Sequence, residues 1–378
     1  MEYRKFGNTG KMVSALGFGC MRFPVINKDP GNIDEVQSAR LLHHAIEQGI
    51  NYFDTAWFYH GGNSESFVGK TIHGRLRQKI FLATKLPPTE VHSYDDMDRI
   101  LNEQLRRLQT DYLDFYLLHA LNKRYWNHLK NLNVIGFLEK AVKDGRIHHI
   151  GFSFHDDHKT FMEIIDSYAW EFCQIQYNYM DTDHQAGQAG LDHTANKGIG
   201  AIIMEPLRGG KLATDLPQEA VELLKSHSPN RSPAAWALRF LWNQPQISIV
   251  LSGMSSIEQM NENIETAQKT KINDMSDAEN NLLERVAELF LQRTRINCTN
   301  CGYCMPCPSG VSIPNCFEYY NKAYIYNDIP AENFRYQLGL NDAERASQCI
   351  RCGSCEPKCP QQIPIMDELA KVAELFEK

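Results

Sequence analysis

Four polar residues stand at or just after the ends of short apolar segments, and their side chains could together transfer a proton. Asp54 ends the segment NYFDT, Tyr59 follows five residues later, Lys85 ends FLATK and His119 ends YLDFYLLH. Taken one at a time, they are compatible with a helix cap, a core aromatic residue, a surface charge and a buried hydrogen-bonding ring. Their chemistry appears only if the fold brings them together.

A phenol with a pKa of about 10 is a poor acid at neutral pH, and a nearby ammonium group lowers that pKa by stabilising the phenolate. Lys85 would do this for Tyr59, while Asp54 would hold Lys85 in place. His119 would donate a hydrogen bond to a substrate oxygen. The set is suited to protonating a carbonyl oxygen as a hydride arrives at the carbon.

The cysteines form a second group that could do chemistry. Nine of the eleven lie after residue 297, whereas Cys20 and Cys173 stand alone. Cysteines so close in sequence cannot connect distant elements as the disulfides of small secreted domains do. They are typical of metal ligands in a reducing compartment, and the N-terminal segment has no apolar signal region. Both features predict a cytoplasmic protein.

Eight of these cysteines form two blocks, and each block is followed by proline. The first block is Cys298, Cys301, Cys304 and Cys307, and the second is Cys349, Cys352, Cys355 and Cys359. The second matches the bacterial ferredoxin run C-x2-C-x2-C-x3-C-P, and the first is one residue shorter at its last gap. The pattern predicts two [4Fe-4S] clusters. Each would be bound by three thiolates of one block and the last cysteine of the other, so that Cys359 completes the first set and Cys307 the second.

Zinc is the competing metal for these blocks. A zinc site typically uses two C-x2-C pairs or adds histidine, and it has no use for a third cysteine at the same step. One cluster with spare thiols is the other alternative. Cys316 lies in an expected helix, IPNCFEYYNKAYIYN, and is predicted to pack as a small apolar residue.

The elements that must position the first group alternate along the chain. After an expected hairpin with a turn at Asn8–Gly10, eight short apolar runs follow: VSALGFG, INYFDT, IFLATKL, YLDFYLLH, HHIGFSF, CQIQYN, AIIMEPL and ISIVLSG. Continuous apolarity is typical of parallel strands buried on both faces. Eight strands alternating with helices predict a (β/α)8 TIM barrel, whose chemistry belongs at the C-terminal ends of its strands.

Helical periodicity separates these runs. Residues Met97, Ile100, Leu101, Leu105 and Leu108 follow one face, as do Val36, Ala39, Leu42 and Ile46, and Gly49 and Gly145 mark helix ends. A doubly wound sheet is the alternative fold. Its nearest dinucleotide fingerprint is Gly17-Phe18-Gly19, but Arg22 stands where the third glycine is needed. A Leu- and Glu-rich helix over about Asp277–Gln292 leads towards the cysteines.

Length and charge bound the remaining possibilities. The 378 residues suit a large domain plus a small one, which we place at 1–290 and 291–378. A net charge of −7 argues against nucleic acid or an anionic membrane as a partner. The longest apolar runs are far shorter than a membrane span.

Residues Met1 to Asn273 resemble the aldo-keto reductases. The motifs FDTAWFY, ATK, LLH, IGFS, QIQYN, MEPLRGG and GMSSIEQMNENI occur in the family's order and at its distances. The resemblance places Asp54, Tyr59, Lys85 and His119 on the family's catalytic tetrad, with Tyr59 as the general acid. It implies a small carbonyl or alcohol substrate and NADP(H) or NAD(H) as cofactor.

The resemblance also implies a set of cofactor contacts. Ser153 and Gln174 would bind the nicotinamide carboxamide, Met21 would lie near the nicotinamide, Pro206 and Leu207 would follow the pyrophosphate, and Gly253, Ser255, Gln259, Glu262 and Asn263 would hold the adenosine half. Three positions depart from the family pattern: Phe154 replaces an asparagine, Met204 an aromatic residue and Gln259 a position that is often basic. Arg208 and Lys211 would supply the charge that Gln259 lacks for a 2′-phosphate.

The tail resembles the α-helical ferredoxin-like domains appended to some aldo-keto reductases of anaerobic prokaryotes, and NDAERASQ is expected to be helical within it. Because nicotinamide delivers two electrons as hydride and a cluster accepts one at a time, an external flavoprotein or another redox partner would reduce the clusters, or the clusters would be structural. The leading hypothesis is a hydride-transferring oxidoreductase. The alternative is a redox-responsive protein that binds cofactor and docks a partner without physiological carbonyl reduction.

A further motif, HDDH at His155–His158, could bind a metal. It lies at an expected helix start, where aspartate is a routine cap, and the capping role is the one we expect.

Overall fold

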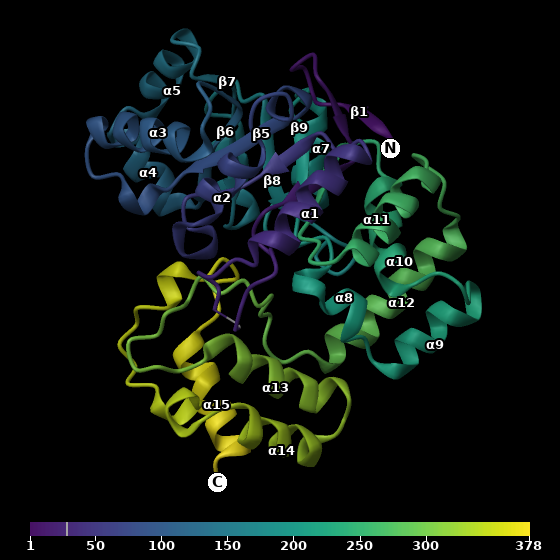
Figure 1. Cartoon of the computed structure of the whole chain (residues 1–378). Helices are drawn as coiled ribbons and strands as arrows, with labels where there is room; N and C mark the ends of the chain where they lie inside the picture. Colours follow the sequence, from purple (N-terminus) through teal and green to yellow (C-terminus); the bar gives the residue numbers. More distant parts are fainter. Residues whose placement is uncertain (28) are drawn as a thin grey trace. The chain divides into compact units, whose positions relative to one another are not determined.

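The computed structural model describes residues 1–27 and 29–378. Among these residues, eight parallel strands close into a barrel in the order β10-β3-β4-β5-β6-β7-β8-β9 (Figure 1). The strands are β3 (Leu16–Gly19), β4 (Tyr52–Asp54), β5 (Phe81–Leu86), β6 (Leu113–Leu121), β7 (Ile147–Phe154), β8 (Phe172–Gln176), β9 (Gly200–Met204) and β10 (Ile247–Ser252). The predicted (β/α)8 barrel is confirmed, and the doubly wound alternative is wrong.

A hairpin closes the end of the barrel at which the strands begin. Strands β1 (Tyr3–Lys5) and β2 (Met12–Ser14) pair antiparallel, as expected. Phe6, at the end of β1, is fully buried and its ring lies 5.0 Å from that of Phe115 and 5.4 Å from that of Phe172. A Cβ atom on Gly200 would lie only 2.3 Å from the Phe6 ring, so glycine is required there. With this end filled, the opposite ends of the strands are left for chemistry.

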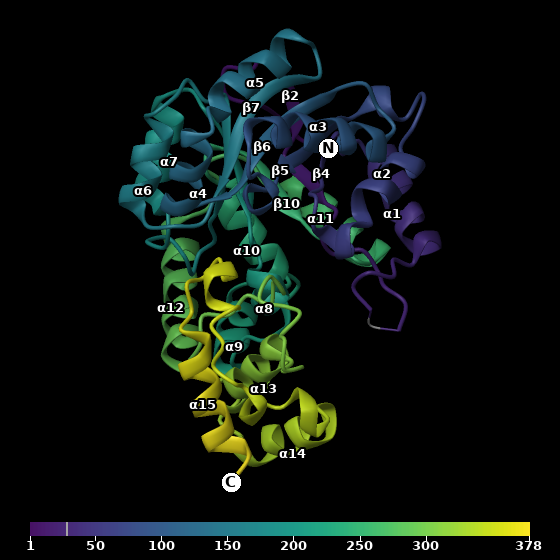
Figure 2. The ribbon, with the colours of Figure 1, turned by 90° about the vertical axis from the view of Figure 1, so that its left-hand side faces the viewer.

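Helices cover the outside of the barrel (Figure 2). They are α1 (Glu35–Glu47), α2 (Ser64–Thr71), α3 (Tyr94–Leu108), α4 (Lys123–Asn131), α5 (Val134–Lys143), α6 (His158–Ile165), α7 (Gly187–Asn196) and α11 (Ile257–Lys269). Gly49 and Gly145, which follow the ends of α1 and α5, have φ values of 86° and 76°. Glycine adopts this left-handed backbone without strain, which confirms both as helix terminators.

The predicted helix faces are only partly correct. In α3, Met97, Ile100, Leu101 and Leu108 are buried as expected, but Gln104 completes the stripe. In α1, the buried stripe is Ser38, Leu41, Leu42 and Ala45, and Val36 is exposed. The prediction that Val36 shares the core-facing side is therefore wrong, because it stands in the first turn of the helix, on another face.

Contacts between residues divide the chain into two compact units. The first comprises Met1–Pro206 and Leu238–Met275, and the second comprises Leu207–Ala237 and Ser276–Lys378. The second unit contains α8 (Lys211–Thr214), α9 (Gln218–His227), α12 (Asp277–Arg293), α13 (Ile313–Ile325), α14 (Ile329–Gly339) and α15 (Ile365–Phe376), and α10 (Pro233–Trp242) runs from one unit into the other. The helix expected over Asp277–Gln292 is confirmed as α12. The predicted boundary between residues 290 and 291 falls inside the second unit.

The tail after α12 has a hydrophobic core of its own. Helices α13 and α15 supply Phe317, Tyr320, Leu369 and Phe376 to it. Six cysteines of the two blocks pack against it, namely Cys298, Cys304, Cys307, Cys349, Cys355 and Cys359. Cys316 is fully buried in this core, as predicted. The expected helix over NDAERASQ is wrong, because this segment forms two short 3-10 turns, at Asp342–Glu344 and Ala346–Gln348.

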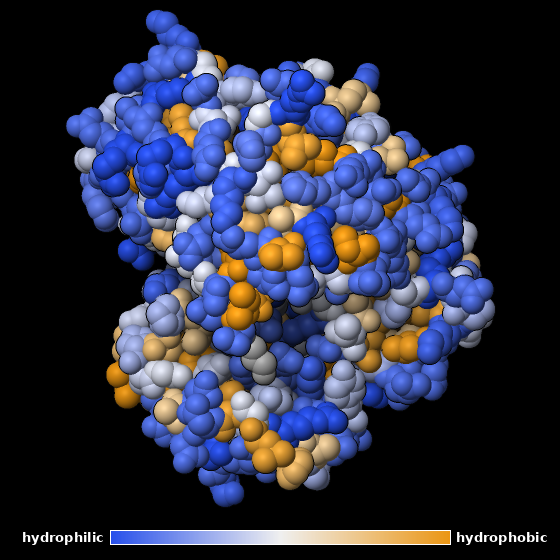
Figure 3. Space-filling model, viewed as in Figure 1, coloured by the Kyte–Doolittle hydropathy of each residue, from blue (hydrophilic) through white to orange (hydrophobic). Residues whose placement is uncertain are grey.

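Figure 3 shows a mostly hydrophilic face with scattered hydrophobic side chains. In the two described ranges, none of the helices has the length and apolarity that crossing a membrane requires.

Candidate active site and cysteine centres

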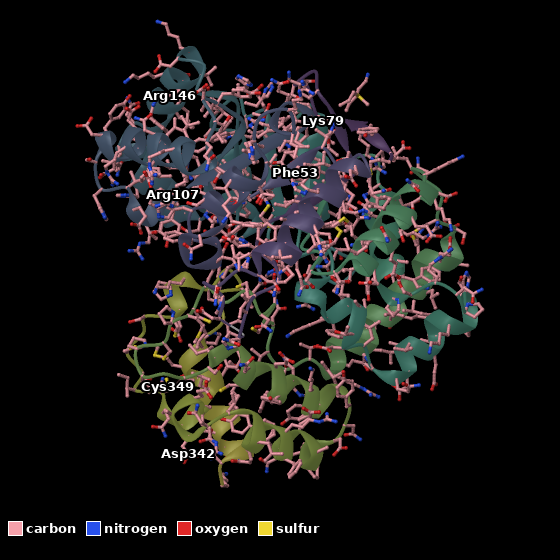
Figure 4. The ribbon with its side chains drawn as sticks, viewed as in Figure 1. Phe53, Lys79, Arg107, Arg146, Asp342 and Cys349 are labelled. Carbon is pink, nitrogen blue, oxygen red and sulfur yellow. The ribbon has the colours of Figure 1, made fainter. Side chains whose placement is uncertain are left out.

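The four residues of the expected proton-transfer set come together at the carboxyl ends of the strands. Asp54 is the last residue of β4, Lys85 is next to last in β5, and His119 lies near the end of β6. Tyr59 begins a 3-10 turn after β4. Figure 4 labels Phe53, the residue of β4 that precedes Asp54. Parallel register sets the strand ends side by side, with Asp54 opposite Ala83 and Lys85 opposite Leu117.

Lys85 is the hub of this set. Its Nζ atom donates to Asp54 Oδ1 at 2.5 Å, to the Thr55 carbonyl at 2.9 Å and to the Tyr59 hydroxyl at 3.2 Å. The Lys85 side chain is 1% exposed and that of Asp54 is 3% exposed. The Tyr59 and His119 rings meet edge to face with centroids 6.1 Å apart. An ammonium group therefore lies between a carboxylate and a phenol in a site shielded from water.

Burial and charge act in opposite directions on these groups. Burial raises the pKa of Asp54, and the Lys85 ammonium opposes that shift. Burial lowers the pKa of His119 well below its usual value, and Lys85 and His155 lower it further. His119 is consequently a neutral imidazole at pH 7, which can donate a hydrogen bond without carrying charge.

A β-bulge aims His119. Leu118 pairs with Phe152 but Leu121 pairs with Phe154, so β6 holds one residue more than β7 over this stretch. The extra residue falls at His119–Ala120, and Ala120 has a left-handed φ of 49°. Bulges are common beside active sites because they redirect a side chain. The sequence gives no sign of this one.

Sequence reasoning missed a buried polar network behind Lys85. Glu65 is fully buried and accepts hydrogen bonds from Thr84 Oγ1 at 2.6 Å and Gln104 Nε2 at 2.8 Å. Gln104 Nε2 also donates to the Lys85 carbonyl at 2.9 Å, and Arg107 pairs with Glu65 at 3.2 Å. The network fixes the backbone that carries Lys85. The spacing of Gln104 from Leu101 and Leu108 was the available signal, since it places Gln104 on the buried stripe of α3.

His60 is a second residue that sequence reasoning missed. It follows Tyr59 with a left-handed φ of 54°. Its Nε2 atom accepts the Phe23 backbone N–H at 3.2 Å, and its Nδ1 atom lies 2.8 Å from the Pro30 carbonyl. An acceptor role for Nε2 leaves the proton on Nδ1, so the ring is neutral. His60 thereby ties the loop after β3 to the turn that carries Tyr59.

The residues expected at the nicotinamide lie on neighbouring strand ends. Ser153 is on β7 and Gln174 on β8, and the two are paired in register. Gln174 is 3% exposed, and no described residue is a hydrogen-bond partner of its Oε1 atom. A carboxamide NH2 group would satisfy this buried acceptor. Met21 follows β3 and is half-buried. Phe154 is buried at the end of β7, so it offers no polar contact there.

The residues expected at the adenosine half cluster at the start of α11. Gly253, Ser255, Gln259 and Glu262 are exposed and Asn263 is buried. Gln259 Oε1 accepts from the Ser255 N–H at 2.9 Å, and Asn263 Nδ2 donates to Ser252 Oγ at 3.1 Å. Pro206 ends the barrel unit and is buried, whereas Leu207 begins the second unit and is half-buried.

The two cysteine blocks share one backbone conformation. In the first, Asn300 and Gly302 flank Cys301 with φ values of 56° and 77°. In the second, Arg351 and Gly353 flank Cys352 with φ values of 53° and 73°. The residues before and after the middle cysteine are thus left-handed in both blocks. The chain builds the same three-thiol loop twice.

Electrostatic contacts group the thiols across the blocks. Burial raises the pKa of Cys304, and the nearby thiols of Cys301, Cys298 and Cys359 raise it further. Burial likewise raises the pKa of Cys355, with smaller contributions from Cys349 and Cys352. Cys359 therefore lies with the first block. This arrangement fits the crossed ligand pattern of a two-cluster ferredoxin.

Over residues 1–27 and 29–378, no group of three or more His, Cys, Asp or Glu side chains could hold a single metal ion. In a cubane cluster each thiolate binds a different iron, so its ligands stand farther apart than those of one ion. In the HDDH motif, Asp157 caps α6 by accepting from the Thr160 N–H at 2.8 Å. The capping role expected for it is confirmed.

Comparison with known proteins agrees with both parts of the chain. The sequence profile of the aldo/keto reductase family matches residues 15–284, and that of a 4Fe-4S dicluster domain matches residues 297–363. The uncharacterized oxidoreductase YqkF of Bacillus subtilis is 26% identical over 304 residues, which cover 72% of this chain and 94% of the relative. L-Galactose dehydrogenase of Arabidopsis thaliana is 28% identical over 283 residues, covering 70% and 87%.

A solved structure shows the same fold. The aldo-keto reductase AKR11C1 from Bacillus halodurans, in its holo form, superimposes with a TM-score of 0.63 and 26% identity over 76% of this chain and 96% of that one. The chain belongs to the aldo/keto reductase family and is an NAD(P)H-dependent oxidoreductase with a 4Fe-4S domain.

Proposed function

We propose that the barrel exchanges hydride with a small carbonyl or alcohol substrate and that Tyr59 transfers the accompanying proton. The observation that carries this proposal is the position of Lys85 Nζ, which lies 2.5 Å from Asp54 Oδ1 and 3.2 Å from the Tyr59 hydroxyl. A bound nicotinamide cofactor supplies the hydride in the reducing direction. The protein residues handle the proton and the charge on oxygen.

In the reducing direction, Tyr59 gives its proton to the carbonyl oxygen. The Lys85 ammonium stabilises the phenolate that remains, because the two groups are in hydrogen-bond contact in a buried site. Asp54 keeps Lys85 in position, and neutral His119 donates to the substrate oxygen. In the oxidising direction the same groups act in reverse order.

The cofactor is proposed to be NADP(H) or NAD(H), held by the residues that the resemblance implies. The buried Gln174 Oε1 atom supports binding of the nicotinamide carboxamide. At the adenosine half, Gln259 carries no charge that would select for a 2′-phosphate. Met21, Ser153, Pro206, Leu207, Gly253, Ser255, Glu262 and Asn263 complete the proposed contact set.

In the tail we propose two [4Fe-4S] clusters with crossed ligands. One set is Cys298, Cys301, Cys304 and Cys359, and the other is Cys349, Cys352, Cys355 and Cys307. The repeated left-handed turns in the two blocks support two equivalent loops. The proposed domains are 1–290 for the barrel and 291–378 for the iron–sulfur part. So many cysteines remain thiolates only in a reducing compartment, and this favours the cytoplasm.

An external one-electron donor, such as a flavoprotein, is the proposed partner of the clusters. Hydride carries two electrons and a cluster accepts one, so direct transfer from the cofactor would need a converter.

The experiment for the barrel is anaerobic binding and turnover with Tyr59→Phe. Phenylalanine keeps the ring but has no proton to give. Reduction of a small aldehyde such as 4-nitrobenzaldehyde by NADPH or NADH should fall by about 100-fold or more. Cofactor affinity, followed by fluorescence titration, should stay within about twofold. Full activity in this variant, or no cofactor binding by the wild type, would refute the proposal.

A further inference from the structure

A lysine outside both cysteine blocks donates a hydrogen bond to the first cysteine of the tail. Lys211 Nζ donates to the Cys298 carbonyl oxygen at 2.6 Å. Lys211 begins α8, is half-buried, and belongs to the same compact unit as the cysteines. Lys211 was expected from the sequence to provide charge for a cofactor phosphate. In the structure its ammonium is directed at Cys298 instead.

Cys298 is held at its sulfur as well as at its carbonyl. The Asn300 backbone N–H donates to Cys298 Sγ at 3.4 Å, and the Asn300 amide donates to Glu318 at 3.3 Å. Hydrogen bonds to cluster thiolates are among the features that set a reduction potential. Hydrogen bonds therefore connect the turn at Cys298 to Lys211 on one side and, through Asn300, to Glu318 of α13 on the other.

Two carboxylates near Lys211 also pair with a second cation, Lys322. Arg208, Asp215 and Glu318 face it electrostatically. Lys322 Nζ lies 2.6 Å from Glu318 and 3.8 Å from Asp215, so both carboxylates have a second cation. Lys211 therefore shares the two carboxylates with Lys322, and its own ammonium group donates to the Cys298 carbonyl.

The second block has a different environment. Its two cations, Arg351 and Lys358, are both exposed, and Arg351 pairs with Asp367 at 2.7 Å. Hydroxyl groups lie near two of the sulfurs expected at the second cluster. Ser309 Oγ is 3.4 Å from Cys307 Sγ, and Ser354 Oγ is 3.5 Å from Cys352 Sγ. An exposed, paired charge is strongly screened by water, whereas a half-buried one is screened much less.

We propose that Lys211 raises the reduction potential of the cluster bound by Cys298. This inference rests on the two clusters of the proposed function. Reduction adds one electron from an external one-electron donor and no proton, so the cluster gains one negative charge, which a fixed nearby cation stabilises.

The test uses the full-length protein, purified without oxygen, as wild type, Lys211→Met and Lys211→Arg. Each is analysed for iron and sulfide and titrated with dithionite under electron paramagnetic resonance. The methionine variant should lower one of the two midpoint potentials by about tenfold in the reduction equilibrium, which is about 59 mV for one electron. The arginine variant should keep the wild-type value. Lys225→Met, which removes an exposed charge from α9 of the same unit, is the matched control and should change neither potential.

The outcomes separate the inference from the function on which it rests. Iron-loaded Lys211→Met with both potentials unchanged would overturn the inference alone. Wild-type protein without iron and sulfide would overturn the clusters and the inference together. If Lys211→Met loses iron, Lys211→Gln, which keeps a hydrogen-bond donor without the charge, takes its place. The same shift in Lys225→Met would show a general charge effect and would also overturn the inference.

Discussion

The Ala120 backbone N–H donates a hydrogen bond to Ser153 Oγ at 2.7 Å, and this bond joins the bulge after His119 to the neighbouring strand. Ser153→Ala leaves this half-buried N–H without its acceptor, which costs about 1–3 kcal/mol. Because the bulge aims His119, kcat for carbonyl reduction should fall about tenfold or more. Steady-state kinetics with cofactor and substrate varied separately would measure it.

The matched variant is Ser153→Thr, which keeps the hydroxyl group. It should retain most of the wild-type kcat. If Ser153→Ala changed only the KM for the cofactor and left kcat intact, Ser153 would serve the nicotinamide alone and the bond to Ala120 would have no catalytic role.

Among the barrel carboxylates outside the tetrad, we predict that substitution of Glu65 lowers the free energy of unfolding most. It accepts from Thr84 and Gln104 and pairs with Arg107 while fully buried. Glu65→Ala strands these donors, and breaking a buried pair in this way costs about 3–5 kcal/mol. The free energy of unfolding, measured by denaturant titration, should fall by that amount.

Glu103 provides the control on the same arginine. It also pairs with Arg107, at 2.9 Å, but it lies on the outer side of α3 and is half-buried. Glu103→Ala should cost less than about 1 kcal/mol, as is usual for a solvent-accessible pair. Equal losses in the two variants would contradict the assignment of Glu65 to a buried network.

Strand ends and helix faces were not equally predictable from the sequence. Lys85 and His119 end continuous apolar runs, and a parallel barrel sets such ends together, so their meeting followed from pattern alone. The bulge at Ala120 did not, because it depends on a difference of one residue between the β6 and β7 pairings. Local pattern carries no information about that pairing.

The burial of several helix residues also differs from what the sequence predicted. Val36 is apolar yet exposed, and Gln104 is polar yet buried. Helix α14 escaped prediction because Phe334 and Leu338 are exposed while Glu332 is buried. Periodicity reports hydrophobicity, and it cannot show that the hydrogen-bond partners of Gln104, which are Glu65 and the Lys85 carbonyl, lie on other elements.

His155 should make stability fall in mild acid. Burial lowers the pKa of His155 to about 4 in the folded protein, against about 6.5 unfolded. Between these values the unfolded chain binds more protons, so the free energy of unfolding decreases as pH falls below about 6.5 and is unaffected above it. At pH 5 the loss from this group should be on the order of 1–2 kcal/mol.

His155→Gln should reduce this dependence by about the same 1–2 kcal/mol, as measured by denaturant titration at pH 5 and pH 7.5, and the part that remains comes from groups such as His119, whose pKa is also lowered. His43→Gln, which changes an exposed histidine on α1, should leave the wild-type dependence in place. If wild type and His155→Gln lost the same stability between the two pH values, His155 would not be the titrating group.

Serine substitutions test the crossed ligation of the tail. Cys359→Ser and Cys307→Ser should each reduce bound iron from about eight to about four atoms per chain, because each removes one thiolate of one cluster. The electron paramagnetic resonance signals that remain should differ between them, since Cys359 lies near Cys304 and the proposed crossed pattern assigns Cys307 to the other cluster. Iron and sulfide analysis together with electron paramagnetic resonance spectra of the anaerobically purified variants would measure both effects.

Two further cysteines make that answer decisive. Cys316 packs in the tail core, so Cys316→Ser should keep both clusters. Cys355 lies near Cys349 and Cys352, so Cys355→Ser should remove the same signal as Cys307→Ser. If Cys355→Ser instead matched Cys359→Ser, each block would bind its own cluster. The grouping of Cys359 with Cys298 and Cys304 would then have no counterpart in the loaded protein.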